Sequence, residues 1–184
     1  MKDIYFPESE SQITADTEFG KAEALREFFA YLKKETDELG VVTSADLFGM
    51  VTTNTDDLNI GQVLEYALPY FDYIAPMVYP SHYPRGFNGW QNPNHYPHEV
   101  IEFSMSRAAS RVREMKRATT TPEAVREHLD VLQLRPWIQD FDYGGNYGPA
   151  EVRTQIEAVY DSGLTSWMMW DPANRYTVEA LQKE

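Results

Sequence analysis

The sequence predicts an α/β fold of the (β/α)8 TIM-barrel type, in which parallel strands alternate with helices. Four short, β-rich runs begin near residues 41, 72, 134 and 165, which gives intervals of 31, 62 and 31 residues. One strand and helix unit takes about 30 residues, so the double interval contains an insertion. Acidic and aromatic residues follow several of these runs. In closed parallel barrels the active site lies at that end of the strands, so the pattern favours an enzyme.

The four runs are predicted to be parallel strands, because each is apolar, too short for a helix and followed by loop residues. Their expected ranges are Val41–Phe48, Tyr73–Val78, Arg135–Phe141 and Ser166–Trp170. A fifth run, Ile4–Pro7, is expected to be the end of a strand whose beginning is missing, since four residues are too few to cross a domain core.

Amphipathic segments between the strands predict the helices. Thr17–Leu39 carries a stripe of apolar residues, and Gly40 follows it as a C-terminal cap. Asp57 is expected to cap a helix over Leu58–Leu68. The later helices are expected to open at proline, at Pro97, Pro122 and Pro149. The segment from Tyr79 to Pro97 has no periodicity, and a loop of this length is expected to have a binding or lid function.

One domain is expected over residues 1–184. A complete (β/α)8 barrel usually takes about 250 residues and rarely fewer than about 200, so the sequence predicts an incomplete barrel that lacks its N-terminal strands. Open sheet edges in such a chain predict self-association. The alternative is a doubly wound, flavodoxin-like sheet, but no glycine-rich phosphate loop follows any of the runs.

Composition restricts the possible partners. The chain has 29 acidic and 16 basic residues and a formal net charge of −13, which argues against nucleic acid and anionic membranes and favours a neutral substrate. The absence of cysteine excludes disulfides and thiolate metal sites. No run reaches the roughly 18 apolar residues of a membrane span, so no membrane insertion is expected. The many aromatic residues suit stacking on sugar rings, although aromatic residues more often fill a core.

Five sequence motifs occur in order along the chain: FPES, SADLFG, DYIAPMVYPSHY, LRPWIQDF and SWMMWDPANRY. Together they resemble the later strands of a family of TIM-barrel domains that are similar to glycoside hydrolases and whose substrate is unknown. The resemblance covers nearly the whole chain and implies that it contains about strands four to eight. It further implies a glycosidase, a polysaccharide substrate and a secreted or cell-surface bacterial location.

The first motif departs from the family pattern. In the family the fourth strand ends in a motif similar to FDYIRFP, and aligning Phe6 and Pro7 with its last two residues places the family's Asp at Lys2 and its Arg at Tyr5. Asp3 is one position away, so this acid is shifted, rebuilt or lost. The departure supports an alternative function, a non-catalytic carbohydrate-binding domain on a degenerate or truncated barrel.

Glycoside hydrolysis requires two carboxyl groups across the scissile bond, one protonated and one ionised. The candidates that follow strands are Asp46, Asp140, Asp142, Asp171 and Glu8. Side-chain alternation along Trp137–Asp142 predicts that Asp140 and Asp142 share one face and Gln139 the other, and Asp140 is favoured as the inward acid. Each Asp has an alternative interpretation as a turn or loop cap.

Substrate contacts are expected from aromatic and polar residues near the same strand ends. These candidates are Tyr79, His82, Tyr83, Trp137, Gln139, Trp170 and Asn174. His95 and His98 lie three positions apart at a predicted helix start, which is a weak metal signal. No metal and no cofactor are expected.

Overall fold

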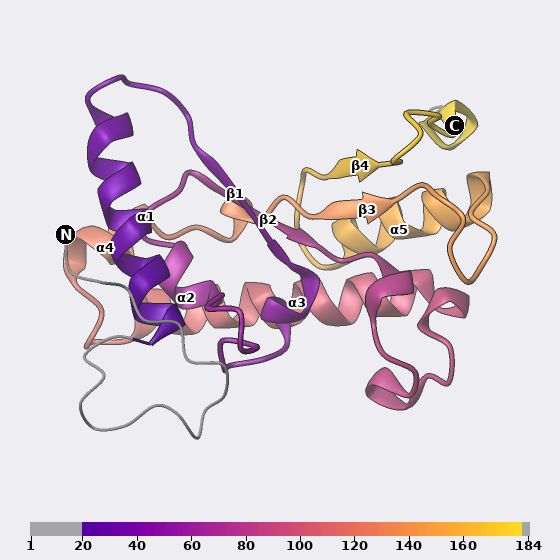
Figure 1. Cartoon of the computed structure of the whole chain (residues 1–184), viewed down its shortest axis with the longest axis horizontal. Coiled ribbons are helices and arrows are strands. Elements are labelled where there is room, and N and C mark those ends of the chain that lie inside the picture. The colour runs from indigo at the N-terminus through magenta and orange to yellow at the C-terminus, as the bar shows by residue number, and fades with distance from the viewer. Residues whose placement is uncertain (1–19, 182–184) are drawn as a thin grey trace.

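A computed structural model describes residues 20–181, and in this part of the chain a parallel sheet is covered by helices (Figure 1). The strands are β1 (Ser44–Phe48), β2 (Tyr73–Met77), β3 (Trp137–Gln139) and β4 (Met168–Trp170). They lie in the order β1-β2-β3-β4, and every neighbouring pair is parallel. The predicted α/β class and the parallel strands are therefore confirmed, whereas Ile4–Pro7 lies outside the described residues.

Every observed strand is shorter than its predicted run. β1 begins at Ser44, three residues after Val41, and the Val41 and Val42 side chains are 53% and 74% exposed. The chain joins the sheet at Thr43, whose N–H and hydroxyl both donate to the Asp72 carboxylate at 2.7 and 3.0 Å. β-propensity alone cannot locate this point, because it depends on a partner 29 residues away.

The helices follow the predicted order. They are α1 (Lys21–Asp37), α2 (Leu64–Ala67), α3 (Pro97–Arg117), α4 (Glu123–His128) and α5 (Pro149–Asp161). The prediction of a helix over Leu58–Leu68 was wrong for its first half, because Leu58 and Asn59 have positive φ angles of 53° and 55°. Asp57 accepts the Asn59 N–H at 2.9 Å and forms a local turn instead of a helix cap.

The core lies between the sheet and the long helices α3 and α5, which Figure 1 shows on the same face of the sheet. Strand side chains that point to this face are buried, as Leu47, Ile74 and Ile138 show with exposures of 2%, 0% and 0%. They meet apolar side chains of the two helices, including the fully buried Ile101 and Val152. Burial of this face fixes which side of each strand is turned toward the helices.

The opposite face of the sheet is open within the described residues. Phe48 and Trp170 point to it and remain 46% and 42% exposed. Trp137 lies edge to face with Trp170, with ring centroids 6.0 Å apart, and its indole N–H donates to Asp46 at 2.9 Å. β1 and β4 are the two edges of the sheet, which does not close in this part of the chain.

The long segment after β2 contains more structure than the predicted loop. It forms three single-turn 3₁₀ helices, η3 (Pro80–His82), η4 (Phe87–Gly89) and η5 (Pro93–His95). Aromatic rings hold it against α3, since Phe87 lies 4.6 Å from Tyr83 and 5.8 Å from Phe103 between ring centroids. Packing of these rings orders a segment that lacks sequence periodicity.

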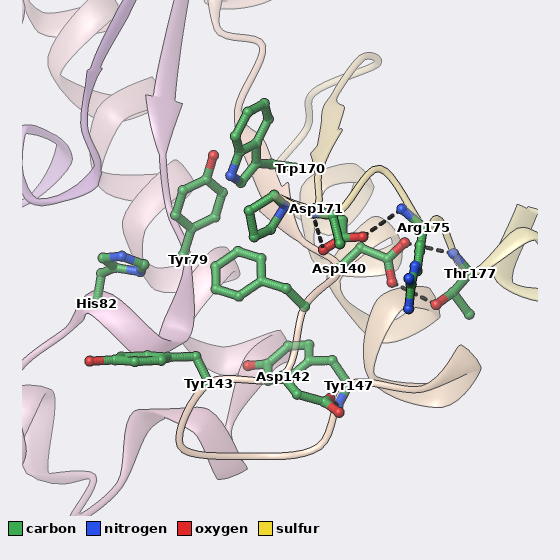
Figure 2. Close-up of a pocket in the computed structure, with 13 residues that line it drawn as sticks. Tyr79, His82, Asp140, Asp142, Tyr143, Tyr147, Trp170, Asp171, Arg175 and Thr177 are labelled. Carbon is green, nitrogen blue, oxygen red and sulfur yellow. Dashed lines mark hydrogen bonds between the residues drawn. The ribbon is translucent and has the colours of Figure 1, made fainter.

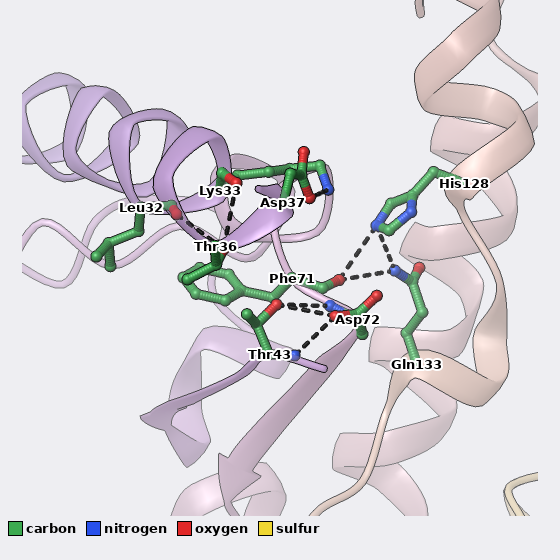
Figure 3. A network of polar contacts seen from close by, with 9 residues as sticks. All are labelled: Leu32, Lys33, Thr36, Asp37, Thr43, Phe71, Asp72, His128 and Gln133. Atoms are coloured by element: carbon green, nitrogen blue, oxygen red, sulfur yellow. Dashed lines mark hydrogen bonds and ion pairs between the residues drawn. The ribbon is translucent and has the colours of Figure 1, made fainter. Parts of the chain in front are cut away.

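A polar network secures the start of β2 (Figure 3). Thr43 and Asp72 join β1 to β2, while the Phe71 carbonyl accepts from the Gln133 amide at 3.1 Å and lies 3.1 Å from His128 Nε2. The network thereby ties α4 and the turn before β3 to the sheet. No helix between residues 20 and 181 is long and apolar enough to span a membrane.

Candidate functional site

A pocket of about 600 Å³ lies at the C-terminal ends of β2, β3 and β4. Figure 2 shows aromatic rings on one side of it and carboxylates with their hydrogen-bond donors on the other. Six of the predicted site residues line it: Tyr79, His82, Asp140, Asp142, Trp170 and Asp171. They come together because parallel neighbours deliver their C-terminal loops to one edge of the sheet.

Asp140 is buried at the end of β3, with 4% of its surface exposed. One carboxylate oxygen accepts the Thr177 hydroxyl at 2.6 Å, and the other accepts the Thr177 N–H at 2.7 Å. The Asp140 N–H donates to the Trp170 carbonyl at 2.9 Å. Asp140 therefore holds the segment after β4 against the end of β3.

Asp171 has a similar role within one turn. It is 6% exposed, and its two oxygens accept the N–H groups of Arg175 and Ala173 at 2.6 and 3.2 Å. The turn brings Asn174 into the left-handed region with a φ of 54°, a conformation that Asn tolerates better than most residues. Asn174 is exposed and does not line the pocket, so its position reflects the shape of the turn.

Asp142 is the exposed carboxylate of the pocket. One of its oxygens accepts the Tyr147 N–H at 2.7 Å and closes the glycine-rich loop between β3 and α5. Its second oxygen has no hydrogen-bond partner among the described residues, in contrast to the paired oxygens of Asp140 and Asp171. A ligand in the pocket can therefore reach an acceptor on Asp142 without breaking an existing bond.

The predicted alternation along Trp137–Asp142 does not extend to the acids. β3 ends at Gln139, so Asp140 and Asp142 follow the strand, and within it Trp137 and Gln139 share the face opposite the buried Ile138. Asp140 and Asp142 instead reach the pocket from the loop. Gln139 is fully buried, and it accepts the Ser81 N–H and donates to the Phe141 carbonyl, so it joins the ends of β2 and β3.

His82 lies at the centre of the aromatic side of the pocket. Its ring stacks on Tyr143 with an interplanar angle of 27° and a centroid distance of 6.1 Å, and it tilts against Tyr79 at 5.3 Å. Partial burial lowers the pKa of the His82 imidazole below its ordinary value, so the ring is neutral at neutral pH. Its Nδ1 lies 3.0 Å from the Ser81 hydroxyl, which leaves Nε2 for a ligand.

Tyr79 and Asp46 are coupled by charge. Burial raises the pKa of the Tyr79 hydroxyl well above its ordinary value, and the negative charge of Asp46 raises it further. Asp46 does not line the pocket but lies on β1, where it is exposed and bonded to Trp137 through one oxygen. Asp46 and Trp137 are thus placed on the open face of the sheet beside the pocket.

Tyr83 is packed inside the protein and does not reach the main pocket. It is 5% exposed, its hydroxyl lies 2.9 Å from the Ser104 hydroxyl, and burial raises its pKa to about 12. It borders a smaller neighbouring cavity and not the main pocket. Glu8 lies outside the described residues.

Several residues that line the pocket were not predicted from the sequence. They are Phe141, Tyr143, Tyr147, Pro172, Ala173, Arg175 and Thr177. Tyr143 and Tyr147 could have been predicted as site residues, since both belong to the loop that follows a predicted strand. Tyr147 is 7% exposed, and its hydroxyl has no partner among the described residues. Thr177 carried no signal, because its role depends on Asp140, which lies 37 residues earlier.

The weak metal signal of His95 and His98 has another explanation in the fold. His98 Nε2 lies 3.0 Å from an Asp161 carboxylate oxygen, and His95 Nε2 lies 3.1 Å from the Asn92 amide. Among residues 20–181 no group of three or more acidic or histidine side chains is placed to hold a metal ion.

Comparison with known proteins gives one family. No curated protein and no solved structure is significantly similar to the chain. A sequence model of the family described as "putative glycosyl hydrolase domain" matches residues 3–176, which is nearly the whole chain. The chain therefore belongs to this glycosyl-hydrolase-like family.

Proposed function

We propose that the pocket at the strand ends binds a carbohydrate and that the protein hydrolyses a glycosidic bond of a polysaccharide. The observation that carries the proposal is the meeting of Asp140, Asp142 and Asp171 with stacked aromatic rings in one pocket of about 600 Å³. Carboxyl groups supply the acid, base or nucleophile of this reaction, and aromatic faces receive sugar rings. Family membership supports the same chemistry.

The parallel sheet is proposed to be part of a (β/α)8 barrel, about strands four to eight. The spatial order of the strands follows their sequence order, and α3 and α5 cover the same face of the sheet. A flavodoxin-like sheet would reverse its strand order at a switch point and carry helices on both faces. The aromatic side chains on the open face, such as Phe48 and Trp137, suit the packed interior of a barrel.

Among the four candidate acids, Asp142 is best placed for proton transfer. It is exposed in the pocket, and one of its oxygens has no partner among residues 20–181, whereas Asp140 and Asp171 use both oxygens to hold the backbone or Thr177. Asp46 also has one oxygen without a partner in the described part of the chain, and its charge raises the pKa of Tyr79 across the edge of the pocket. Asp142 with Asp46 is therefore the first pair to test, before the buried pair Asp140 and Asp171.

The second candidate function is carbohydrate binding without turnover. It is favoured by the anchoring roles of Asp140 and Asp171, which explain both buried aspartates without catalysis. The aromatic side of the pocket, with His82, Tyr143 and Trp170, would serve binding equally well. Substitution of Asp142 distinguishes the two functions.

The test compares wild type with Asp142→Asn on a panel of polysaccharides, with release of reducing ends as the measure of turnover and calorimetry as the measure of binding. Loss of a general acid or base lowers the rate by about 10²-fold or more while binding is retained. Asp57→Asn is the matched control, since Asp57 also accepts a single backbone N–H but lies outside the pocket.

The outcomes separate the hypotheses. Binding by wild type without any turnover would establish the binding function, and the absence of both would overturn the proposal. Full activity of Asp142→Asn would exclude Asp142 and direct the same experiment to Asp46, Asp140 and Asp171.

A further inference from the structure

A second cavity adjoins the main pocket and differs from it in chemistry. It has a volume of about 120 Å³ and lies where β1 and β2 end. Its lining residues are Phe48, Gly49, Met50, Met77, Tyr79, His82 and Tyr83. Tyr79 and His82 line both cavities, so these two rings form the border between them.

The small cavity is apolar except at that border. The Tyr83 hydroxyl is already engaged with Ser104, and the methionine side chains provide only weak acceptors. At the border, no hydrogen bond joins the Tyr79 hydroxyl or His82 Nε2 to another residue between 20 and 181, since His82 contacts Ser81 through Nδ1. A substituent in this cavity therefore needs an apolar tip and a polar group behind it.

The backbone closes the cavity tightly on one side. A Cβ atom added to Gly49 would lie 2.3 Å from the Met77 carbonyl oxygen, so only glycine lets the end of β1 approach β2 this closely. Met50 and Met77 are half-buried beside this contact. Their flexible thioether side chains pack around small apolar groups of varied shape.

Charge and solvation exclude other substituents. The main pocket has three carboxylates and one arginine, Arg175, and the chain has a net charge of −13, so a sulfate or carboxylate on the sugar would be repelled. A bare hydroxyl would lose its hydrogen bonds with water on entering an apolar cavity. An acetamido group avoids both costs, because its methyl group is apolar and its amide can bond at the border.

We propose that the small cavity receives the N-acetyl group of an amino sugar, so that the protein acts on a polymer of N-acetylated amino sugars. This inference rests on the proposed carbohydrate-binding function of the main pocket. The sugar ring occupies the main pocket, the acetyl methyl group packs against Met50 and Met77, and the amide meets the Tyr79 hydroxyl and His82 Nε2. Tyr79 and His82 then recognise the substituent through its amide at the border between the two cavities.

The test uses an array of immobilised oligosaccharides of several linkages. Each N-acetylated amino sugar on the array is matched with its deacetylated form and with the sugar that has a hydroxyl at the same carbon. Wild type is expected to bind the N-acetylated member at least about tenfold more tightly, since an apolar pocket distinguishes groups that differ by one methyl or methylene by about this factor or more.

Two variants at one position test the cavity itself. Met50→Trp fills it and is expected to remove the preference for N-acetylated sugars while binding of the hydroxyl forms persists. Met50→Ala enlarges it and is expected to extend binding to sugars with a longer N-acyl chain. Leu132→Trp is the matched control, because Leu132 is 48% exposed in the turn before β3 and lies outside both cavities.

The outcomes distinguish this inference from the function on which it rests. Equal binding of all three members of a matched set by wild type overturns the inference and leaves the proposed carbohydrate binding in place. Preference for N-acetylated sugars that is unchanged in both Met50 variants also overturns it. Binding to no sugar on the array overturns the proposed function as well.

Discussion

Asp140→Asn is expected to lower the free energy of unfolding by about 2–4 kcal/mol. The Asp140 carboxylate accepts one hydrogen bond from the Thr177 hydroxyl and one from the Thr177 N–H, and hydrogen bonds to charged groups contribute about 1.5–3 kcal/mol each. The amide of the substituted side chain keeps an oxygen that accepts the Thr177 N–H, while its NH₂ donates to the Thr177 hydroxyl, which rotates to accept. Both contacts lose the negative charge of the carboxylate at a site that is 4% exposed, and neutral hydrogen bonds contribute only about 0.5–1.5 kcal/mol each.

Thr177→Val removes only the hydroxyl donor and is expected to cost about 1.5–3 kcal/mol. In the Asp140→Asn background, Thr177→Val removes only a neutral hydrogen bond, whereas in wild type it removes a charge-assisted one. The two changes are therefore expected to be less than additive, with a coupling energy of about 1–2 kcal/mol, as is usual for contacting residues. Urea unfolding followed by tryptophan fluorescence measures all three variants.

An anchoring role and a catalytic role for Asp140 predict different effects of substitution on stability and turnover. Asp142→Asn, at an exposed carboxylate with one accepted bond, is expected to change the unfolding free energy by less than about 1 kcal/mol. If Asp140→Asn instead leaves the urea midpoint unchanged and abolishes turnover, Asp140 is a catalytic group and the reasoning from its hydrogen bonds fails.

Two further predictions concern stability and association. The hydrogen bond from the Thr43 backbone N–H lowers the pKa of Asp72 in the folded protein. The stability that ionised Asp72 adds is therefore fully present above its unfolded pKa of about 4, and it is lost as the pH falls through the lower folded value. The difference in urea midpoint between wild type and Asp72→Asn should therefore be largest near neutral pH and shrink toward pH 3. In the sheet that residues 20–181 form, Phe48 and Trp170 are exposed on the open face and β1 and β4 are unpaired edges, which predicts self-association. Sedimentation velocity that shows only monomer at high concentration would contradict this.

The parallel strands were predictable because their signals are local. The first β-rich run ends at Gly49, and helices open at Pro97 and Pro149 as expected. The extent of each strand was not predictable, because it depends on distant partners such as Thr43 with Asp72. The false helix at Leu58 has a local cause, since hydrogen bonds to the Asp56 and Asp57 carboxylates from nearby N–H groups compete with helix formation.

The position of the site was predictable for a different reason. Parallel strands send their C-terminal loops to one edge, so acids after neighbouring strands must come near one another, and Asp140, Asp142 and Asp171 do line one pocket. The residues that arrive from the loops, such as Tyr147 and Arg175, depend on turns whose shape the sequence does not reveal. Tyr83 and Gln139 lie near the same edge but point into the protein.

The individual role of each aspartate depends on hydrogen bonds that only the fold provides. Asp140 and Asp142 are two residues apart on one loop. Asp140 is buried with both oxygens bonded, whereas Asp142 is exposed and one of its oxygens is unbonded within residues 20–181. Both are aspartates on the loop after β3, so the sequence does not distinguish them. The difference comes from Thr177, which follows β4 and donates to Asp140. A sequence pattern can therefore place carboxylates at an active-site edge, but the donor that meets each oxygen decides which of them remains available for chemistry.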